Sequence, residues 1–176
     1  MRIQRVGGIV GPAAFVAAWA LGSVLADDYS AVDDAISRLA AVGADTRWLM
    51  TAGFVIFGIG VPLFAPLLPR PAAVTATIAG LATLAVAATP LDWSDGVDTL
   101  HGVFAATGYV ALALTPILGA SLLPGPWSRV SVTIGVIAGA CLVLTAFSDA
   151  NGLFQRIGLT LCDAWIVTVA LRTQPP

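Results

Sequence analysis

Six long apolar runs account for most of this chain, and they restrict what it can fold into. Their approximate bounds are 7–26, 47–68, 72–90, 99–122, 127–147 and 151–171. A helix needs about 20 apolar residues to cross a hydrocarbon layer about 30 Å thick, so each run is long enough to span a membrane. The sequence is 58% hydrophobic, more than a soluble domain of 176 residues can bury. We predict an all-α, polytopic membrane protein, a single domain over residues 1–176 with six transmembrane helices.

The charged residues are divided between the two ends of the predicted helices. Arginine lies near both chain termini and in the loops after the second and fourth runs, at Arg2, Arg5, Arg70, Arg129 and Arg172. Nine of the ten aspartates lie in the other three loops. Because arginine in short loops marks the cytoplasmic side, we predict a multi-pass protein of the cell membrane with cytoplasmic N- and C-termini and an acidic outer face.

The composition also excludes some classes of partner and cofactor. The net charge of −2 predicts no nucleic-acid partner. The chain has no lysine, so it cannot hold retinal or pyridoxal phosphate as a Schiff base. Cys141 and Cys162 both lie within apolar runs, where small packing residues are more common than a disulfide or a metal pair. We therefore expect no cofactor and no metal.

The segment 30–43, between the first two runs, has a different pattern. It is too short and too polar to span a membrane, yet apolar residues recur at helical spacing, at Val32, Ile36, Leu39 and Val42. Ser30 with Asp33 resembles a capping box, and Gly43 suits a helix end. The pattern predicts a short outer amphipathic helix that lies on the membrane surface with its apolar face down.

Local signals mark the ends and the contact faces of the long helices. Asp45 is placed to cap the N-terminus of the second helix, and Asp98 that of the fourth. Pairs of glycines four residues apart predict close helix packing in the first and fifth runs, at Gly7 and Gly11 and at Gly135 and Gly139.

Two segments of the chain are similar to one another. The stretch 51–71, "TAGFV…LLPRP", matches 106–126, "ATGYV…LLPGP", at a constant offset. Duplication of a helical hairpin, over about 51–92 and 106–149, would explain the match. A general preference for proline after leucine at inner turns would explain it as well, and both interpretations stay open.

The turn "PLDWSDGVDTLHG", residues 90–102, gathers three aspartates and the only histidine. Asp92, Asp95 and Asp98 are spaced by three residues, and His101 follows at the same spacing. A solvated turn explains the pattern. A cation site is the alternative, although the spacing does not fit the EF-hand loop and one histidine is poor evidence for zinc.

The sixth run contains two charged residues, Arg156 and Asp163. Arg156 lies near the outer boundary, where it needs acceptors; Asp92, Asp98 and Asp149 are the nearest candidates along the chain, and an anionic headgroup is the alternative. Asp163 is deeper and should face the bundle interior, either as a structural carboxyl group or as a contact for a substrate, ion or proton.

Four short motifs, in this order along the chain, resemble the family called domain of unknown function 998. They are "DAISRL" (34–39), "WLMTAGFVIFGIG" (48–60), "DTLHG" (98–102) and "NGLFQRIGL" (151–159). The resemblance implies a six-helix integral membrane protein of small size, and it implies no activity, because the family is named for lacking one. Carried over residue by residue, it directs attention to Ser37, His101 and Arg156.

Three functions are compatible with these observations. The first is a binding protein whose outer polar pocket holds a lipid headgroup, a small amphiphile or a membrane-protein partner, including a second copy. Its candidate contacts are His101, Arg156, Ser37, Arg38, Asp92, Asp98, Asp149 and Asp163. The second is a metal-assisted lipid hydrolase, which the single histidine disfavours. The third is a small proton-coupled transporter that uses Asp163.

Overall fold

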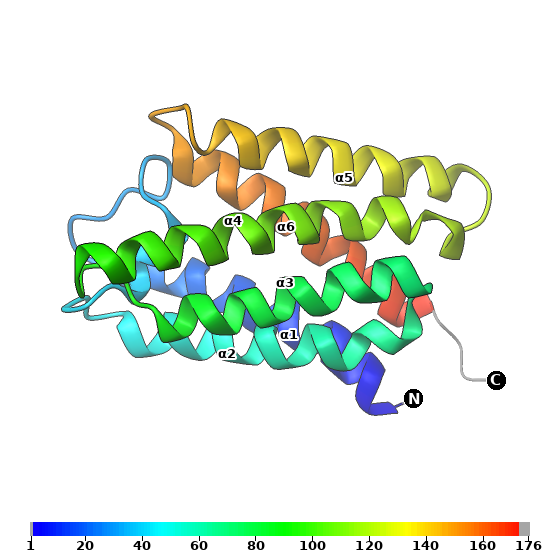
Figure 1. Ribbon diagram of the computed structural model, residues 1–176, viewed down its shortest axis with the longest axis horizontal. Helices are drawn as coiled ribbons and strands as arrows, with labels where there is room; N and C mark the ends of the chain where they lie inside the picture. The colour runs from blue at the N-terminus through cyan, green and yellow to red at the C-terminus, as the bar shows by residue number, and fades with distance from the viewer. Residues whose placement is uncertain (1, 173–176) are drawn as a thin grey trace.

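The computed structural model describes residues 2–172, and six long helices account for most of them (Figure 1). The helices are α1 (Arg2–Leu25), α2 (Arg47–Phe64), α3 (Arg70–Ala88), α4 (Asp95–Leu118), α5 (Pro126–Leu144) and α6 (Asn151–Arg172). Three short 3-10 helices lie between them: η1 (Ile36–Ala40), η2 (Ala65–Leu67) and η3 (Ala120–Leu122). All six long helices are long and apolar enough to cross a membrane, which confirms the predicted fold class.

The helices form one antiparallel bundle. Helices adjacent in the chain pack against each other from α1 to α5, and α6 lies against α5, α4 and α1. Figure 1 shows the start of α1 and the end of α6 at one end of the bundle and the loops 26–46, 89–94 and 145–150 at the other, hereafter the acidic end. The distribution of arginine and aspartate along the sequence predicts that these two groups of segments lie at opposite ends of the helices.

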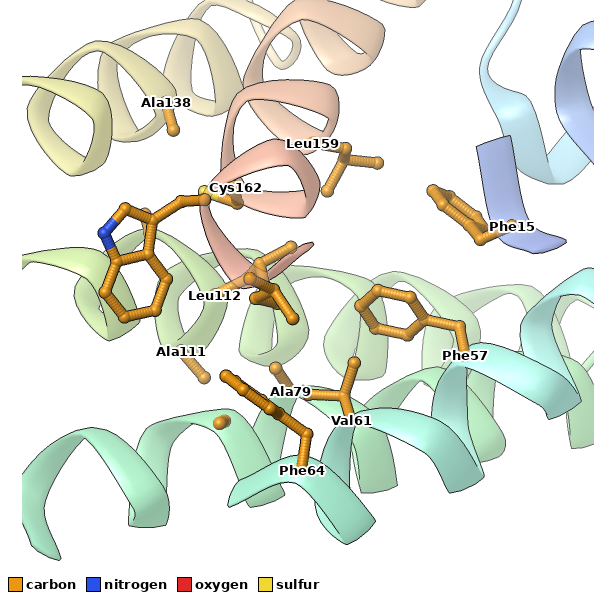
Figure 2. Packing of buried hydrophobic residues seen from close by; sticks show 14 of the residues in the cluster. Phe15, Phe57, Val61, Phe64, Ala79, Ala111, Leu112, Ala138, Leu159 and Cys162 are labelled. Carbon is orange, nitrogen blue, oxygen red and sulfur yellow. The ribbon is translucent and has the colours of Figure 1, made fainter. Parts of the chain in front are cut away.

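The core lies where α6 faces the other helices. In Figure 2, Leu159 and Cys162 of α6 lie above Leu112 of α4, with Phe57 of α2 to its right and Val61 of α2 below it. All five are less than a tenth exposed. Cys162 and Cys141 are both free and buried, as expected for packing residues.

Glycine allows the closest helix contacts. A Cβ atom on Gly60 of α2 would lie 2.7 Å from the carbonyl oxygen of Gly7 and 2.9 Å from the Cα of Gly11. A Cβ atom on Gly135 of α5 would lie 2.6 Å from the carbonyl oxygen of Ala113 in α4. Gly7, Gly60 and Gly135 therefore lie at helix interfaces where a side chain would force the backbones apart, whereas a Cβ atom on Gly139 would meet only the Ala113 Cβ at 3.8 Å.

The two predicted helix caps are wrong. The N-cap of α2 is Thr46, whose hydroxyl donates to the Leu39 carbonyl at 2.9 Å. The N-cap of α4 is Ser94, whose hydroxyl accepts from the Val97 N–H at 3.4 Å. The turn before α4 allows the helix to begin a full turn earlier than expected. The Asp98 carboxylate instead accepts a hydrogen bond from the backbone N–H of Asp92.

The expected amphipathic helix over 30–43 is also wrong in form. Its capping residues close only a turn, because Ser30 Oγ donates to the Asp33 carboxylate at 2.6 Å and the Ser30 N–H to that of Asp34 at 2.8 Å. The five-residue helix η1 follows. Its three-residue period places Ile36 and Leu39 on one face, each 1% exposed. The segment therefore closes the acidic end of the bundle, with Ile36 and Leu39 packed against the core.

The two similar sequence segments adopt similar local structures. The hairpin α2–η2–α3 contains a helix, a three-residue 3-10 helix and a second helix that has proline in its first turn. The hairpin α4–η3–α5 repeats that arrangement.

Candidate functional site

Arg156 is buried at the start of α6 and holds the loop between α1 and η1. Its Nη1 atom donates to the carbonyl oxygens of Ala31 at 2.7 Å, Asp34 at 3.1 Å and Gly152 at 3.0 Å. Its Nη2 atom donates to the hydroxyls of Ser23 and Tyr29. Both Nη atoms are therefore solvated by dipoles from three parts of the chain, whereas Nε is buried and has no hydrogen-bond partner within residues 2–172.

Aromatic rings complete the surroundings of this cation. The Arg156 Cζ atom lies 5.3 Å from the ring centroid of Trp19 and 5.5 Å from that of Tyr29. Ring faces are negative and attract a cation at this distance. Burial raises the pKa of Tyr29 above its ordinary value, and the hydrogen bond from Arg156 opposes that rise. Tyr29 therefore stays protonated at physiological pH.

The acceptors predicted for Arg156 are wrong. Within residues 2–172, the one ion pair joins Arg38 to Asp92, and Arg156 has none. Asp149 is exposed, and the Asp98 carboxylate accepts a hydrogen bond from the Asp92 N–H in the turn before α4. Backbone carbonyls replace the carboxylates because the loop passes directly over the first turn of α6, where a Cβ atom on Gly152 would overlap the Asp34 carbonyl oxygen.

The residues 31–42, hereafter the roof segment, are fixed to α6 at two further points. The N–H of Leu153 donates to the Val32 carbonyl at 2.9 Å. The N–H of Ile36 donates to Gln155 Oε1 at 2.7 Å. Since a backbone N–H can only donate, the Gln155 oxygen must face Ile36, and its Nε2 then donates to the Tyr109 hydroxyl.

The opposite side of the roof segment is held by the turn between α3 and α4. The Val42 N–H donates to the Leu91 carbonyl at 2.9 Å. Arg38 Nη1 lies 2.9 Å from both carboxylate oxygens of Asp92. Both of these side chains are about half exposed, so this pair is a surface contact.

A cavity of about 50 Å³ lies beneath η1. Phenylalanine side chains from α1 and α2 form much of its wall, together with Leu112 and Leu159. Its polar lining residues come from four elements: Ser37, Thr83, His101, Tyr109 and Gln155. Among the described residues, His101 is the one lining the cavity that can carry a charge near neutral pH.

Two polar groups in this cavity have unused hydrogen-bonding capacity. His101 is 5% exposed, and its Nδ1 lies 2.6 Å from the Thr89 carbonyl oxygen. A carbonyl can only accept, so Nδ1 carries the proton and the neutral ring presents Nε2 as an acceptor. Neither Nε2 nor the hydroxyl of Ser37, which is 9% exposed, makes a hydrogen bond with the described part of the chain.

Asp163 is buried separately, in the middle of α6. It is 2% exposed, as predicted for a residue that faces the bundle interior. Both of its carboxylate oxygens are buried and have no hydrogen-bond partner within residues 2–172. It does not line the cavity beneath η1.

Of the predicted site residues, only Ser37 and His101 line the cavity, whereas Arg38, Asp92 and Asp98 contact one another outside it. Arg156 lies beside the cavity and is occupied with the roof segment. Four others lie at the surface of the acidic end: Arg38, Asp92, Asp98 and Asp149. No group of three or more histidine, cysteine, aspartate or glutamate side chains gathers in metal-binding geometry among the described residues.

Gln155 and Tyr109 are site residues that the sequence analysis missed. An uncharged polar side chain within an apolar run is a weak signal. That signal was present for Gln155, because this residue directly precedes Arg156 inside a predicted span, where polar groups need partners.

Comparison with known proteins places the chain in a family. A family model described as "Protein of unknown function (DUF998)" matches residues 9–172, which includes all six long helices in whole or in part. No curated protein and no solved structure matches the chain.

Proposed function

Because the chain belongs to the DUF998 family, whose description assigns no activity, we propose its function from the cavity itself: this membrane protein binds an uncharged, hydrogen-bonding group of a small amphiphile beneath η1. The observation that carries this proposal is the pair of unpartnered polar groups, Ser37 Oγ and His101 Nε2, in one largely apolar cavity. Neither atom is among the fully buried polar atoms that lack a partner, so both are accessible from the cavity, where a ligand can supply the missing hydrogen bonds.

The chemistry of the lining selects the ligand. His101 Nε2 needs a donor, whereas the hydroxyls of Ser37 and Tyr109 can each donate a proton. A hydroxyl or amide group satisfies both requirements. An anionic headgroup is disfavoured, because Arg156 is already occupied and transfer of an unpaired charge into an apolar cavity is costly.

The arginine distribution supports an orientation for the site. Arg2, Arg5, Arg70, Arg129 and Arg172 all lie at the end of the bundle opposite to the cavity roof. If these residues face the cytoplasm, the roof segment and its cavity lie in the outer half of the cell membrane.

Monoolein, an uncharged amphiphile, and sodium oleate, an anionic one, test the proposal. Native mass spectrometry of the detergent-solubilised protein should show monoolein retained in preference to oleate. Loss of one neutral hydrogen bond should weaken monoolein binding about three- to tenfold in Ser37→Ala and in His101→Asn. Asparagine retains a donor near the Nδ1 position for Thr89 and removes only the Nε2 acceptor.

Arg38→Gln is the matched control. It changes a polar residue of η1 that does not line the cavity, so monoolein binding should be unchanged. Equal retention of monoolein by the wild type, Ser37→Ala and His101→Asn would contradict the proposal.

A second candidate function rests on Asp163. A buried carboxyl group without partners inside a span suits proton-coupled transport. Proton flux into liposomes that Asp163→Asn abolishes, while Asp98→Asn does not, would support it.

A further inference from the structure

The cavity beneath η1 is too small to hold a whole amphiphile. Its volume is about 50 Å³. By comparison, an engineered cavity that admits benzene measures about 150 Å³. The cavity therefore has room for a hydroxyl or amide group, and any hydrocarbon attached to that group must lie outside it.

A second hollow lies next to the cavity, between α4 and α5. It is an apolar groove of about 630 Å³, and small residues such as Gly102, Ala106, Gly139 and Ala140 line much of it. Both helices are membrane spans, and in Figure 1 they run beside one another. Because the groove lies within the spans, the material that surrounds it is hydrocarbon.

The cavity and the groove share part of their walls. Ala105 and Tyr109 line both hollows. The Tyr109 hydroxyl is held by Gln155, which also binds the N–H of Ile36 in the roof segment. Ala105 and Tyr109 therefore form the wall between the polar cavity and the groove, and the position of Tyr109 is coupled to that of the roof segment.

We propose, on the basis of the function proposed above, that the ligand is a lipid with a hydrocarbon chain and a small uncharged head, and that it enters from the bilayer between α4 and α5. Its chain lies in the groove, and its head passes Tyr109 to reach Ser37 and His101. The groove offers apolar contact along a whole span, and the cavity offers hydrogen bonds at its end. Together the two hollows accommodate such a lipid, which the cavity alone does not.

The experiment fills the groove without changing the cavity. A Cβ atom on Gly102 meets nothing within 4 Å, and one on Gly139 meets only the Ala113 Cβ at 3.8 Å. The double variant Gly102→Leu/Gly139→Leu therefore adds side chains to the groove without a backbone clash. Gly96→Leu is the matched control, since its Cβ also meets nothing within 4 Å and it lines neither hollow.

Two probes distinguish binding in the groove from binding in the cavity. They are monoolein and glycerol monoacetate, which has the same head and almost no hydrocarbon chain. Both are measured by native mass spectrometry on the full-length protein. The double variant should bind monoolein at least about tenfold more weakly, since lost burial of about two methylenes corresponds to that factor. Glycerol monoacetate binding should be unchanged, and Gly96→Leu should match the wild type for both probes.

Each other result overturns the proposal. Unchanged monoolein binding in the double variant, with binding still lost in His101→Asn, would retain the cavity function and reject the groove. No binding of either probe to the wild type would reject both. Conversion of a dimer to a monomer in the same spectra, without an effect on monoolein, would show that a second copy covers the groove.

Discussion

Gln155 Oε1 accepts a 2.7 Å hydrogen bond from the backbone N–H of Ile36, and this contact joins α6 to the roof of the cavity. Ile36 is 1% exposed and Gln155 is 3% exposed, so bulk solvent has little access to this contact. The same Gln155 side chain also holds Tyr109. One residue thus fixes both the roof of the cavity and the wall toward the α4–α5 groove.

Gln155→Leu should destabilise the protein by about 1–3 kcal/mol, because it leaves the buried Ile36 N–H without an acceptor. Tyr109→Phe removes only the other half of the contact and should cost less, about 1 kcal/mol. Thermal unfolding in detergent gives the ranking, and hydrogen exchange at the Ile36 amide locates the effect. If Gln155→Leu and Tyr109→Phe both left the free energy of unfolding unchanged, Gln155 would not hold the roof segment.

Arg156→Lys should destabilise the protein by about 3 kcal/mol although it keeps the charge. Lysine has a single donor nitrogen, which can replace Nη1 at the carbonyls of Ala31 and Asp34 but leaves the hydroxyls of Ser23 and Tyr29 without the donor that Nη2 supplies. Arg38→Lys is the control, since its exposed pair with Asp92 is worth less than about 1 kcal/mol. Chemical denaturation of both variants measures the difference; similar stabilities would refute the structural role of Arg156.

Gly152→Ala should loosen the roof segment. The added Cβ would overlap the Asp34 carbonyl oxygen and lie 2.8 Å from Arg156 Nη1, so the loop must move away from α6. We expect a cost of about 1–3 kcal/mol, typical of overpacking. Gly96→Ala, in the open first turn of α4, should be neutral or slightly stabilising. A Gly152→Ala protein as stable as Gly96→Ala would contradict the close approach.

Stability should fall at alkaline pH through Tyr29. Its pKa is raised by burial in the folded protein, so above about pH 10 the unfolded chain loses the proton while the folded chain retains it. The contribution is fully present below that pH and is lost as the pH rises toward the folded pKa. Unfolding measured from about pH 8 to about pH 11 should show a shallower fall in Tyr29→Phe than in the wild type.

The orientation can be tested with single cysteines in a background without Cys141 and Cys162. A membrane-impermeant thiol reagent added to intact cells should label Ser94→Cys, at the acidic end, and not Ser128→Cys, at the opposite end. Labelling at position 128 alone would reverse the predicted topology.

The sequence by itself determines the six helices, because each is encoded in a continuous apolar run whose length matches a bilayer. It also indicates a close-packing face at Gly7 and Gly11, since glycines four residues apart leave one face of a helix bare, but that this face meets Gly60 of α2 is known only from the structure. The helical spacing of apolar residues over 30–43 also predicts that Ile36 and Leu39 are buried, although the two residues lie in a 3-10 helix and not in the longer amphipathic helix expected. These properties depend on local spacing, which is visible along the chain.

The partners of the polar residues are decided only by the tertiary structure. Nothing local indicates that Arg156 would be satisfied by the carbonyls of Ala31 and Asp34 instead of by aspartates, or that Gln155 would bridge Ile36 and Tyr109. A backbone carbonyl is present at every residue, so its selection as a partner leaves no mark in the sequence. It follows from how closely the loop after α1 crosses the first turns of α6, which is a property of the packed bundle.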